Sequence, residues 1–343
     1  MGSLWIDGQP EEQVWDEFVA AHPYGNLLQG AAWAAFKARW GWSAHRLLVR
    51  RGAHPVAGVQ VFLRALPLGH TVAYVPRGPV AAPHDEDALS LLWPALHRWA
   101  RSRRAVWLTV EPNWPLPPEA VAPRLRAAGF RPAIRHVQPR ATLLVDLRPS
   151  PEEILARMKQ KWRYNIRLSH RKGVRVRLGQ QEDFGAFYAL MQETGHRDGF
   201  PVRPHAYYRD AWQAFQPAHS ALLLAEHGDD LLAALLIFRH GQRAYYLYGA
   251  STRRERHRMP NHALQWAAMQ WAKEQGCQVY DLWGIPPEAA TGHGDGHGGL
   301  WGVYRFKRGF GGCPVVYPGA FDAVYIPPLY TLYRLLQRRR RPG

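Results

Sequence analysis

Apolar positions along this chain follow two spacings, a helical one of about 3.6 residues and the alternation or short apolar runs that are typical of strands. In the first half, Val14, Trp15 and Phe18 mark the inward face of a helix, and the runs RLLVR and VAGVQVFLRAL indicate two strands joined near residues 52–55. The predicted order is helices over 11–21 and 26–40, strands over 46–50, 56–66 and 71–75, a helix over 85–103, a strand over 105–110, a short helix within 115–130 and a strand over 142–147.

The second half predicts a similar series of elements. The stretch from Tyr245 to Gly284 is the most regular part, because it indicates a strand, a basic loop, a helix that starts at Pro260–Asn261 and a last strand over 278–282. Gly276 stands where a glycine commonly ends a helix. The elements predicted before this stretch are helices over 151–168, 183–196 and 204–215 and strands over 173–178, 221–226, 231–239 and 243–248.

The two halves resemble each other in the order and length of their strands. RLLVRRGAHPVAGVQVFLR and then GHTVAYVPRGP in the first half correspond to ALLLAEHGDDLLAALLIFRH and then GQRAYYLYGAS in the second. In both halves a loop, a helix and an apolar strand follow. We interpret this as an internal duplication of an α/β unit of roughly 150 residues, with the boundary near Pro149–Pro151.

The charge of the chain predicts an anionic partner. The formal net charge is +17 over 343 residues and is carried mostly by arginine. Nucleic acid, a phosphorylated substrate or an acidic membrane face would each fit this excess. The sequence shows neither an apolar run of about 18 residues, as a membrane-spanning helix requires, nor a secretory signal. The two cysteines, Cys277 and Cys313, have no metal-ligand spacing, so we expect a reduced, cytoplasmic protein.

Two basic segments stand out within this background. Between Arg157 and Arg177 there are nine lysines or arginines and no acidic residue, and Trp162 and Tyr164 are interleaved with them. A single helix over this run would place Arg157, Lys161 and Tyr164 near one face. The loop before Pro260 is also rich in arginine and leads to a helix N-terminus, which favours anions. Each segment is either a solvated face or a surface for nucleic-acid phosphates.

Several common catalytic motifs are absent from the sequence. It contains no G-x-S-x-G, no H-E-x-x-H, no C-x-x-C and no phosphate-binding G-x-x-x-x-G-K-[ST] loop. His293, Asp295 and His297 could be imagined as metal ligands, but five glycines in residues 292–299 indicate a flexible loop instead. We therefore expect no metal site and no nucleotide hydrolysis.

The repeated order of hairpin, third strand, loop, helix and buried strand is typical of the acyl-CoA N-acyltransferase (GNAT) fold. In that fold the loop before the helix carries closely spaced glycines, whose backbone N–H groups hold a pyrophosphate. The corresponding loops here, RGPVAA from residue 77 and RHRMPN from residue 256, lack that pattern. An acyl donor other than CoA is therefore preferred.

Eight segments resemble the FemABX peptidoglycan-bridge aminoacyltransferases, and most of all the shorter FemX type. They are NLLQGAAWAAFKARWGW (26–42), YVPRGP (74–79), MKQKWRYNIRLSHRKGV (158–174), HRDGFPVRPHAYY (196–208), YYLYGAST (245–252), YDLWGIP (280–286), GLWGVYRFKRGFGG (299–312) and YPGAFDAVY (317–325). The resemblance covers nearly the whole chain in family order. It implies two tandem GNAT-like domains, residues 1–147 with 317–343 and residues 148–316. The coiled-coil arm of longer members is missing, because residues 192–208 are too short to hold it.

The resemblance also implies an activity and its partners. It predicts transfer of an amino acid (Gly, Ala or Ser) from aminoacyl-tRNA to the stem-peptide amine of a cell-wall precursor. That precursor would be either UDP-MurNAc-pentapeptide or lipid II. No cofactor beyond the tRNA ester is implied. We expect a monomer that binds no DNA, and a peripheral membrane contact is compatible with the lipid-linked acceptor.

Site residues follow from the resemblance position by position. Lys37 and Arg203 would hold the diphosphate of the acceptor, and Tyr207 and Tyr248 would line the same groove. Phe306 and Lys307 would lie at the aminoacyl end of the tRNA and form the catalytic pair. Taken alone, Lys37 is more typical of a surface helix lysine and Tyr248 of a core tyrosine. Candidates for contact with tRNA phosphates are Arg163, Arg167, Arg254 and Arg256.

The implied reaction is aminolysis of an activated ester, which needs a neutral amine, a positioned ester and stabilisation of the developing oxyanion. The ammonium of Lys307 could supply that stabilisation. Glu111 and Asp281, each at the end of a predicted strand, are candidates for the general base, or the ribose hydroxyl beside the ester relays the proton. Two other functions stay open at this point, an acyl-CoA N-acyltransferase and a non-catalytic RNA-binding protein.

Overall fold

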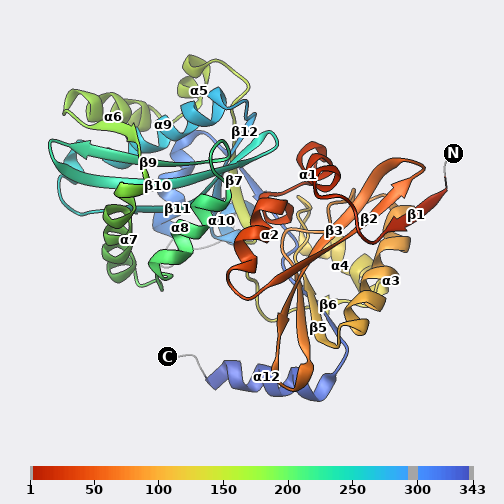
Figure 1. The fold of residues 1–343 in the computed structure, drawn as a ribbon. Coiled ribbons are helices and arrows are strands. Elements are labelled where there is room, and N and C mark those ends of the chain that lie inside the picture. The colour runs from red at the N-terminus through yellow and green to blue at the C-terminus, as the bar shows by residue number, and fades with distance from the viewer. Residues whose placement is uncertain (1–2, 293–299, 340–343) are drawn as a thin grey trace. The chain divides into compact units, whose positions relative to one another are not determined.

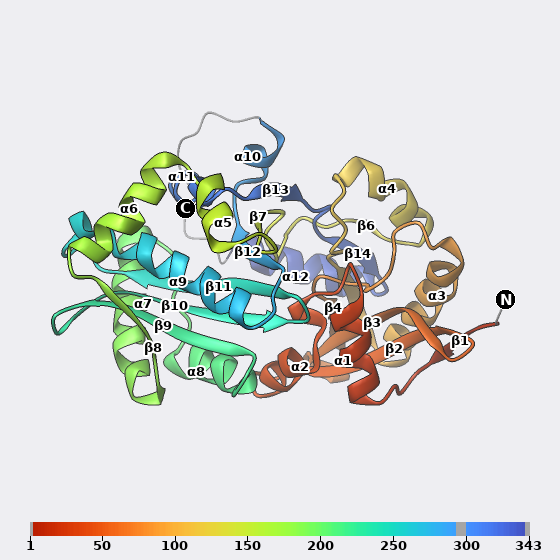
Figure 2. The ribbon, with the colours of Figure 1, turned by 90° about the horizontal axis from the view of Figure 1, so that it is seen from above.

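The computed structural model describes residues 3–292 and 300–339. The chain divides into two compact units, Met1–Arg140 with Val316–Gly343, and Ala141–Val315. Each unit is built on its own seven-stranded sheet with helices packed against it (Figure 1, Figure 2). The predicted α/β class and the two-unit organisation are confirmed.

The sheet of the first unit has the order β1-β2-β3-β4-β5-β14-β6. Helices α3 and α4 cover one face, and α1 and α12 pack on the other. The last segment of the chain returns to this unit, since β14 inserts between β5 and β6. The elements are β1 (Leu4–Asp7), α1 (Glu12–Ala21), α2 (Ala31–Ala38), β2 (Ser43–Arg51), β3 (His54–Ala65), β4 (Thr71–Val75), α3 (Glu86–Ser102), β5 (Ala105–Val110), α4 (Pro118–Ala127), β6 (Arg131–Pro132), β14 (Phe321–Val324) and α12 (Pro327–Arg339).

The sheet of the second unit has the order β13-β7-β12-β11-β10-β9-β8. Helices α6 and α9 lie on one face, while α7 and α8 lie on the other (Figure 1). The elements are β7 (Ala141–Asp146), α5 (Pro151–Arg157), α6 (Gln160–Arg171), β8 (Arg175–Leu178), α7 (Phe184–Asp198), α8 (His205–Ala214), β9 (Ser220–His227), β10 (Asp230–His240), β11 (Arg243–Ser251), α9 (Pro260–Glu274), β12 (Val279–Gly284), α10 (Pro287–Thr291), α11 (Trp301–Lys307) and β13 (Cys313–Val316).

Strand β10 shows why the second unit needs helices on both faces. Leu235 and Ile237 are buried in the same cluster as the apolar residues of α9. Phe238 points the other way and packs edge-on against Phe215, with 5.2 Å between ring centroids. A strand that is buried on both faces reads as a continuous apolar run rather than as an alternation. The run LLAALLIF in β10 has this form.

The segment predicted as one helix over 151–168 forms two helices, so that expectation was wrong. Helix α5 ends at Arg157, and Met158 has an extended backbone (ψ 154°) with a buried side chain. The guanidinium of Arg163 donates to the carbonyl oxygens of Ala156 at 3.1 Å and Met158 at 2.5 Å, which satisfies the end of α5. Arg157 therefore does not share a helix with Lys161.

The division between the units falls after residue 140, whereas the sequence analysis places it after residue 147. The difference is strand β7. It pairs antiparallel with β12, from Val279 opposite Asp146 to Gly284 opposite Thr142, and so belongs to the second sheet. A short apolar strand carries no local mark of the sheet that it joins.

The two units differ at their parallel strand pair. In the first unit β4 and β5 pair from Thr71–Ala105 to Val75–Val110, and the N–H of Glu111 continues the ladder to the Val75 carbonyl at 3.0 Å. In the second unit β11 and β12 pair only over residues 243–245 and 279–281. Beyond them β12 turns to β7 while β11 continues to Ser251. Within the described chain, the parallel strands of the first unit therefore stay paired to their ends, which we call a closed pair. Those of the second unit separate after three residue pairs, which we call an open pair.

We predict that Gly309→Ala destabilises the second unit. A Cβ at residue 309 would lie 2.1 Å from the indole of Trp162, and overpacking of this kind costs about 1–3 kcal/mol. Gly302→Ala in α11 is the matched control, because a Cβ there meets nothing within 4 Å and alanine favours a helix by up to about 1 kcal/mol. Thermal unfolding should show a lower Tm for Gly309→Ala only. Equal Tm values for the two variants would contradict the packing.

Candidate active site

Lys307 lies where β12 leaves β11. It is the last residue of α11, and only 6% of its surface is exposed. Its Nζ donates to the carbonyl oxygens of Gly284 at 2.9 Å and Trp283 at 3.3 Å. Trp283 has a φ of +59°, which turns the end of β12 away. On the β11 side, Nζ lies 5.6 Å from the centroid of the Tyr246 ring.

The protonation of Lys307 is balanced near neutrality. Burial lowers the pKa of its amine to about 7, and the nearby Asp281 carboxylate opposes that shift. Asp281 is itself buried and accepts hydrogen bonds from the Thr142 hydroxyl and, at 2.8 Å, from the Trp283 N–H. A negative charge that develops beside Lys307 would favour its ammonium form. The lysine can therefore supply charge to an oxyanion or exchange a proton.

Phe306 belongs to an aromatic cluster beside Lys307. Its ring packs edge-on against His262 at 5.3 Å and Phe310 at 5.1 Å, and its carbonyl accepts a hydrogen bond from the Trp162 indole at 3.0 Å. Burial lowers the pKa of His262 to about 4, with a further contribution from Lys161. Nε2 of this neutral imidazole accepts from the Asn165 amide at 3.1 Å. The cluster fixes the half-buried Phe306 ring on the α9 face of the sheet.

A bulge in β11 places its tyrosines on opposite faces of the sheet. The register with β10 shifts at Leu247, because Leu236 pairs with Tyr248 whereas Ile237 pairs with Tyr246. Tyr246 is hydrogen-bonded to Gln265 of α9, while the ring of Tyr248 packs against Tyr208 of α8 at 5.0 Å. Residues two apart in a regular strand would share a face.

Three of the four predicted acceptor residues come together on the α8 face. The hydroxyls of Tyr207 and Tyr248 are hydrogen-bonded, and burial raises the pKa of both, so both stay neutral near pH 7. The exposed guanidinium of Arg203 lies 5.5 Å from the centroid of the Tyr207 ring. The backbone N–H of Arg203 also donates to the Tyr208 hydroxyl at 3.1 Å. The result is an exposed cation beside two neutral hydroxyls.

The fourth predicted acceptor residue, Lys37, lies in the first unit. It is half-buried in the last turn of α2, and its Nζ is 5.5 Å from the Phe36 ring centroid and 5.8 Å from that of Trp42. Its place beside two rings is compatible with the predicted role and also with a structural one.

The four arginines predicted to contact tRNA lie on helix α6 and on the loop before α9. Arg163 is half-buried and satisfies the end of α5, whereas Arg167 is exposed on α6. Arg254 is paired with Asp230 at 2.9 Å, and Arg256 is exposed. Their loop touches the end of α6, since the Arg258 guanidinium donates to the Lys172 carbonyl at 2.7 Å and Lys172 Nζ donates to the His257 carbonyl at 3.0 Å. Arg167 is thus the candidate on α6 that faces solvent.

Of the two general-base candidates, Glu111 lies in the first unit, and its carboxylate is hydrogen-bonded to groups of that unit. Its carboxylate accepts from the Tyr74 hydroxyl at 2.5 Å and from the N–H groups of Val137 at 2.7 Å and Gln138 at 3.1 Å. Burial raises the pKa of Glu111, while these donors oppose the shift. Asp281 is the candidate that lies beside Lys307.

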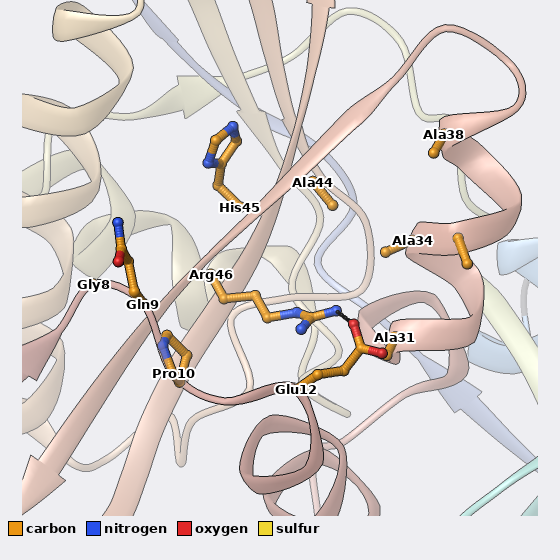
Figure 3. A pocket seen from close by; sticks show the side chains of 11 residues that line it. Gly8, Gln9, Pro10, Glu12, Ala31, Ala34, Ala38, Ala44, His45 and Arg46 are labelled. Atoms are coloured by element: carbon orange, nitrogen blue, oxygen red, sulfur yellow. Dashed lines mark hydrogen bonds and ion pairs between the residues drawn. The ribbon is translucent and has the colours of Figure 1, made fainter.

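A separate hollow of about 410 Å³ lies in the first unit, between the segment before α1, helix α2 and strand β2 (Figure 3). Its floor carries the ion pair of Arg46 with Glu12 at 3.1 Å, and alanines of α2 line one wall. None of the predicted site residues lines it. The charged groups in the hollow already satisfy each other, and the catalytic candidates lie elsewhere.

Two further expectations concern metal and membrane. His293, Asp295 and His297, which the sequence analysis set aside as metal ligands, lie outside the described residues. Within the described residues, no cluster of three or more His, Cys, Asp or Glu side chains could hold a metal ion. No described helix is long and apolar enough to cross a membrane.

Tyr246, Gln265 and His262 also line the candidate site, although no motif in the sequence pointed to them. Tyr246 stood in the aromatic strand, but the bulge that separates it from Tyr248 has no sequence signal there. Gln265 is 2% exposed and also accepts from the Tyr280 hydroxyl at 2.8 Å. A glutamine on the apolar stripe of a helix was the one available sign of this buried network.

We predict that Lys307 makes stability depend on pH between 7 and 10. In the unfolded chain a lysine keeps its proton up to its usual pKa of 10.5, whereas folded Lys307 releases it near 7. The unfolded state binds more protons in this window, so raising the pH stabilises the folded state. Relative to Lys307→Met, the Tm of the unmodified protein should rise by roughly 5 °C or more from pH 7 to pH 10.

The matched control for this measurement is Lys273→Met. Lys273 also donates to backbone carbonyls, those of Leu147 and Pro149 at 2.8 Å, but it is only half-buried. Parallel pH profiles for the unmodified protein and Lys307→Met would contradict the burial of an ionisable amine at this position.

Comparison with known proteins assigns the family. The model of the FemAB family matches residues 11–119, 126–230 and 225–338. A lipid II:glycine glycyltransferase of Staphylococcus saprophyticus is 28% identical in an alignment 395 residues long. The alignment covers 94% of this chain and 93% of the relative.

Solved structures agree on the fold. The crystal structure of FemX superposes with a TM-score of 0.85 at 24% identity, over 96% of this chain and 99% of that one. A tandem GNAT protein from the clavulanic acid biosynthesis pathway gives a TM-score of 0.55 at 14% identity, over 94% and 98%. Both units are GNAT-like, as the sequence predicted. Because the family model matches most of its length, the chain belongs to the FemAB family, and it is a transferase.

Proposed function

We propose that this protein is a tRNA-dependent aminoacyltransferase that adds an amino acid to the stem-peptide amine of a peptidoglycan precursor. Glycine as the transferred residue and lipid II as the acceptor are favoured, because the relatives are named for them. Alanine and serine, or a UDP-linked acceptor, are the variations to test. The aminoacyl ester is an activated donor, so the proposed reaction needs no separate cofactor.

The observation that carries this proposal is the gap between β11 and β12. Past residue 245, β11 has β10 on one edge, and β12 has left the other. Lys307 and Phe306 lie on the α9 side of β11, while Tyr248 and Arg203 lie on its α8 side. A donor that enters from one face and an acceptor amine that enters from the other would meet at this gap.

The proposed step is an addition followed by an elimination. The neutral acceptor amine attacks the ester carbonyl, a C–N bond forms, and the carbonyl oxygen becomes an oxyanion that the Lys307 ammonium stabilises. The attacking amine loses a proton, and the ribose oxygen takes up a proton when its C–O bond breaks. Either the neighbouring ribose hydroxyl or the Lys307 amine relays this proton. The products are an amide and a deacylated tRNA.

The loop before α9 argues against CoA as the donor. A pyrophosphate site needs backbone N–H groups that are free to point at the anion. In this loop the Arg258 N–H donates to the Glu255 carbonyl at 2.8 Å, and the Met259 N–H donates to that of Arg256 at 3.1 Å. The first residue of the helix is Pro260, which has no N–H. Two N–H groups of this loop are therefore already bonded to its own carbonyls, and the first helical residue offers none.

The outer face of α6 supports a nucleic-acid donor. Tyr164 is 53% exposed, and the guanidinium of Arg171 lies 5.6 Å from its ring centroid. Arg167 is exposed on the same helix, and the Arg254–Arg256 loop adjoins its end. Cations interleaved with an exposed aromatic ring are suited to phosphates and bases of RNA.

The proposed function is tested by transfer of labelled glycine from glycyl-tRNA to UDP-MurNAc-pentapeptide and to lipid II, with acetyl-CoA as the rival donor. Lys307→Met should lower kcat by roughly 10²–10³-fold, as loss of an oxyanion donor does, and should keep tRNA binding. Lys273→Met should keep kcat. Full activity of Lys307→Met would refute the role of the lysine, and transfer from acetyl-CoA alone would refute the donor.

We expect Arg203→Ala to weaken the acceptor rather than the chemistry. The guanidinium is exposed, so its removal leaves the fold intact, and loss of one charged contact to a diphosphate should raise KM for the acceptor about tenfold. Arg175→Ala, which removes another exposed arginine of the second unit, should leave KM unchanged. A fall in kcat at constant KM would place Arg203 outside the acceptor site.

A further inference from the structure

Helix α12 presents apolar residues on two faces. On its inward side the rings of Tyr330 and Tyr333 pack on Trp107 of β5, with centroid distances of 5.7 Å and 4.5 Å. On its outward side Leu332 and Leu335 are each 52% exposed. A helix that only covers a sheet normally turns polar residues to water. About half of each outward leucine is therefore open to water instead of packed on the first unit.

The turn between β3 and β4 adds another exposed apolar residue to the same part of the unit. Leu68, at the centre of this turn, is 84% exposed. Leu66 and Val72, on either side of the turn, pack on the cluster that contains Tyr330. Figure 1 shows α12 lying across the end of the sheet where β3 and β4 meet.

Arginines lie beside α12 and beside the β3–β4 turn. The guanidinium groups of Arg131 and Arg334 lie 5.2 Å and 5.5 Å from the Tyr330 ring centroid, and Arg104 adjoins the turn at Gly69. From residue 323 to residue 343 the sequence has five arginines and no acidic residue. Asp322 precedes this segment, but its carboxylate is buried and accepts hydrogen bonds from Thr109 and Tyr330 at 2.6 Å.

We propose that this surface, Leu68, Leu332 and Leu335 with Arg104, Arg131 and Arg334, binds an anionic lipid bilayer; we call it the α12 face. Aliphatic side chains would enter the headgroup boundary while the arginines contact lipid phosphates, as in amphipathic helices that lie on a membrane.

Lipid fits the α12 face better than the other occupants. Tyr330 is buried, and Tyr333 is 37% exposed with its ring packed on Trp107, so the helix offers little aromatic surface for stacking on RNA bases. A second copy of the chain would bring two arginine-rich faces together, which repel each other. The inference is independent of the transfer chemistry. If the proposed function also holds, the α12 face would keep the first unit at the membrane that carries a lipid-linked acceptor.

The test is flotation of the full chain with vesicles of phosphatidylcholine alone or mixed with equal phosphatidylglycerol. Binding should require the anionic lipid and should weaken severalfold when salt is raised. Leu332→Glu/Leu335→Glu should raise the lipid concentration for half-binding by roughly tenfold or more. Both positions face water, so the Tm should not change. Leu178→Glu, which alters a 57% exposed leucine of β8, is the control and should bind like the unmodified protein.

Four outcomes would overturn the proposal. The first two are that the unmodified protein does not bind anionic vesicles, or that the double variant binds them as well as the unmodified protein. The other two are that the double substitution lowers affinity for tRNA and not for vesicles, or that its only effect is to convert a dimer into a monomer. Glycyl transfer separates this inference from the proposed function. The double variant should transfer normally to a UDP-linked acceptor and poorly to lipid II in vesicles, whereas vesicle binding persists even if no transfer is found.

Discussion

The parting of β11 and β12 after three residue pairs is the constraint on which the proposed site depends. A parallel pair that continued would satisfy the backbone of both strands and would leave no room between them. Here Trp283 turns β12 aside, and Lys307 donates to the carbonyls that the turn exposes. The lysine is therefore a structural support of the opening and also the cation that the proposed chemistry requires.

This double role has an energetic cost. A buried amine with a pKa near 7 is held in a place where its charged form is poorly solvated, and Asp281 offsets only part of that penalty. The aromatic ring of Tyr246 and the carbonyls of Trp283 and Gly284 complete the environment. Such poised groups gather at functional sites more often than elsewhere, which supports the proposal that the transfer chemistry takes place in the second unit.

The two copies of the duplicated unit have diverged at this same point. In the first unit the parallel ladder continues to its end, and Glu111, just beyond it, secures the loop at Val137 and Gln138. A closed pair cannot admit a substrate between its strands. The first unit contributes Lys37 of α2 and the α12 face to the two proposals, while the second unit contains the separated strands β11 and β12.

Much of the architecture was readable from local pattern. Strand and helix spacing, the Pro149–Pro151 boundary and the repeated strand order predicted two α/β units. The resemblance indicated Lys307 and Phe306 as one pair and Arg203, Tyr207 and Tyr248 as part of a second group. The fold brings the last three residues together. The sequence could not show the break at Met158, the sheet that β7 joins or the bulge at Leu247, because each depends on which groups pair and pack together in the folded chain. The low pKa of Lys307 likewise arises from burial, which only tertiary packing supplies.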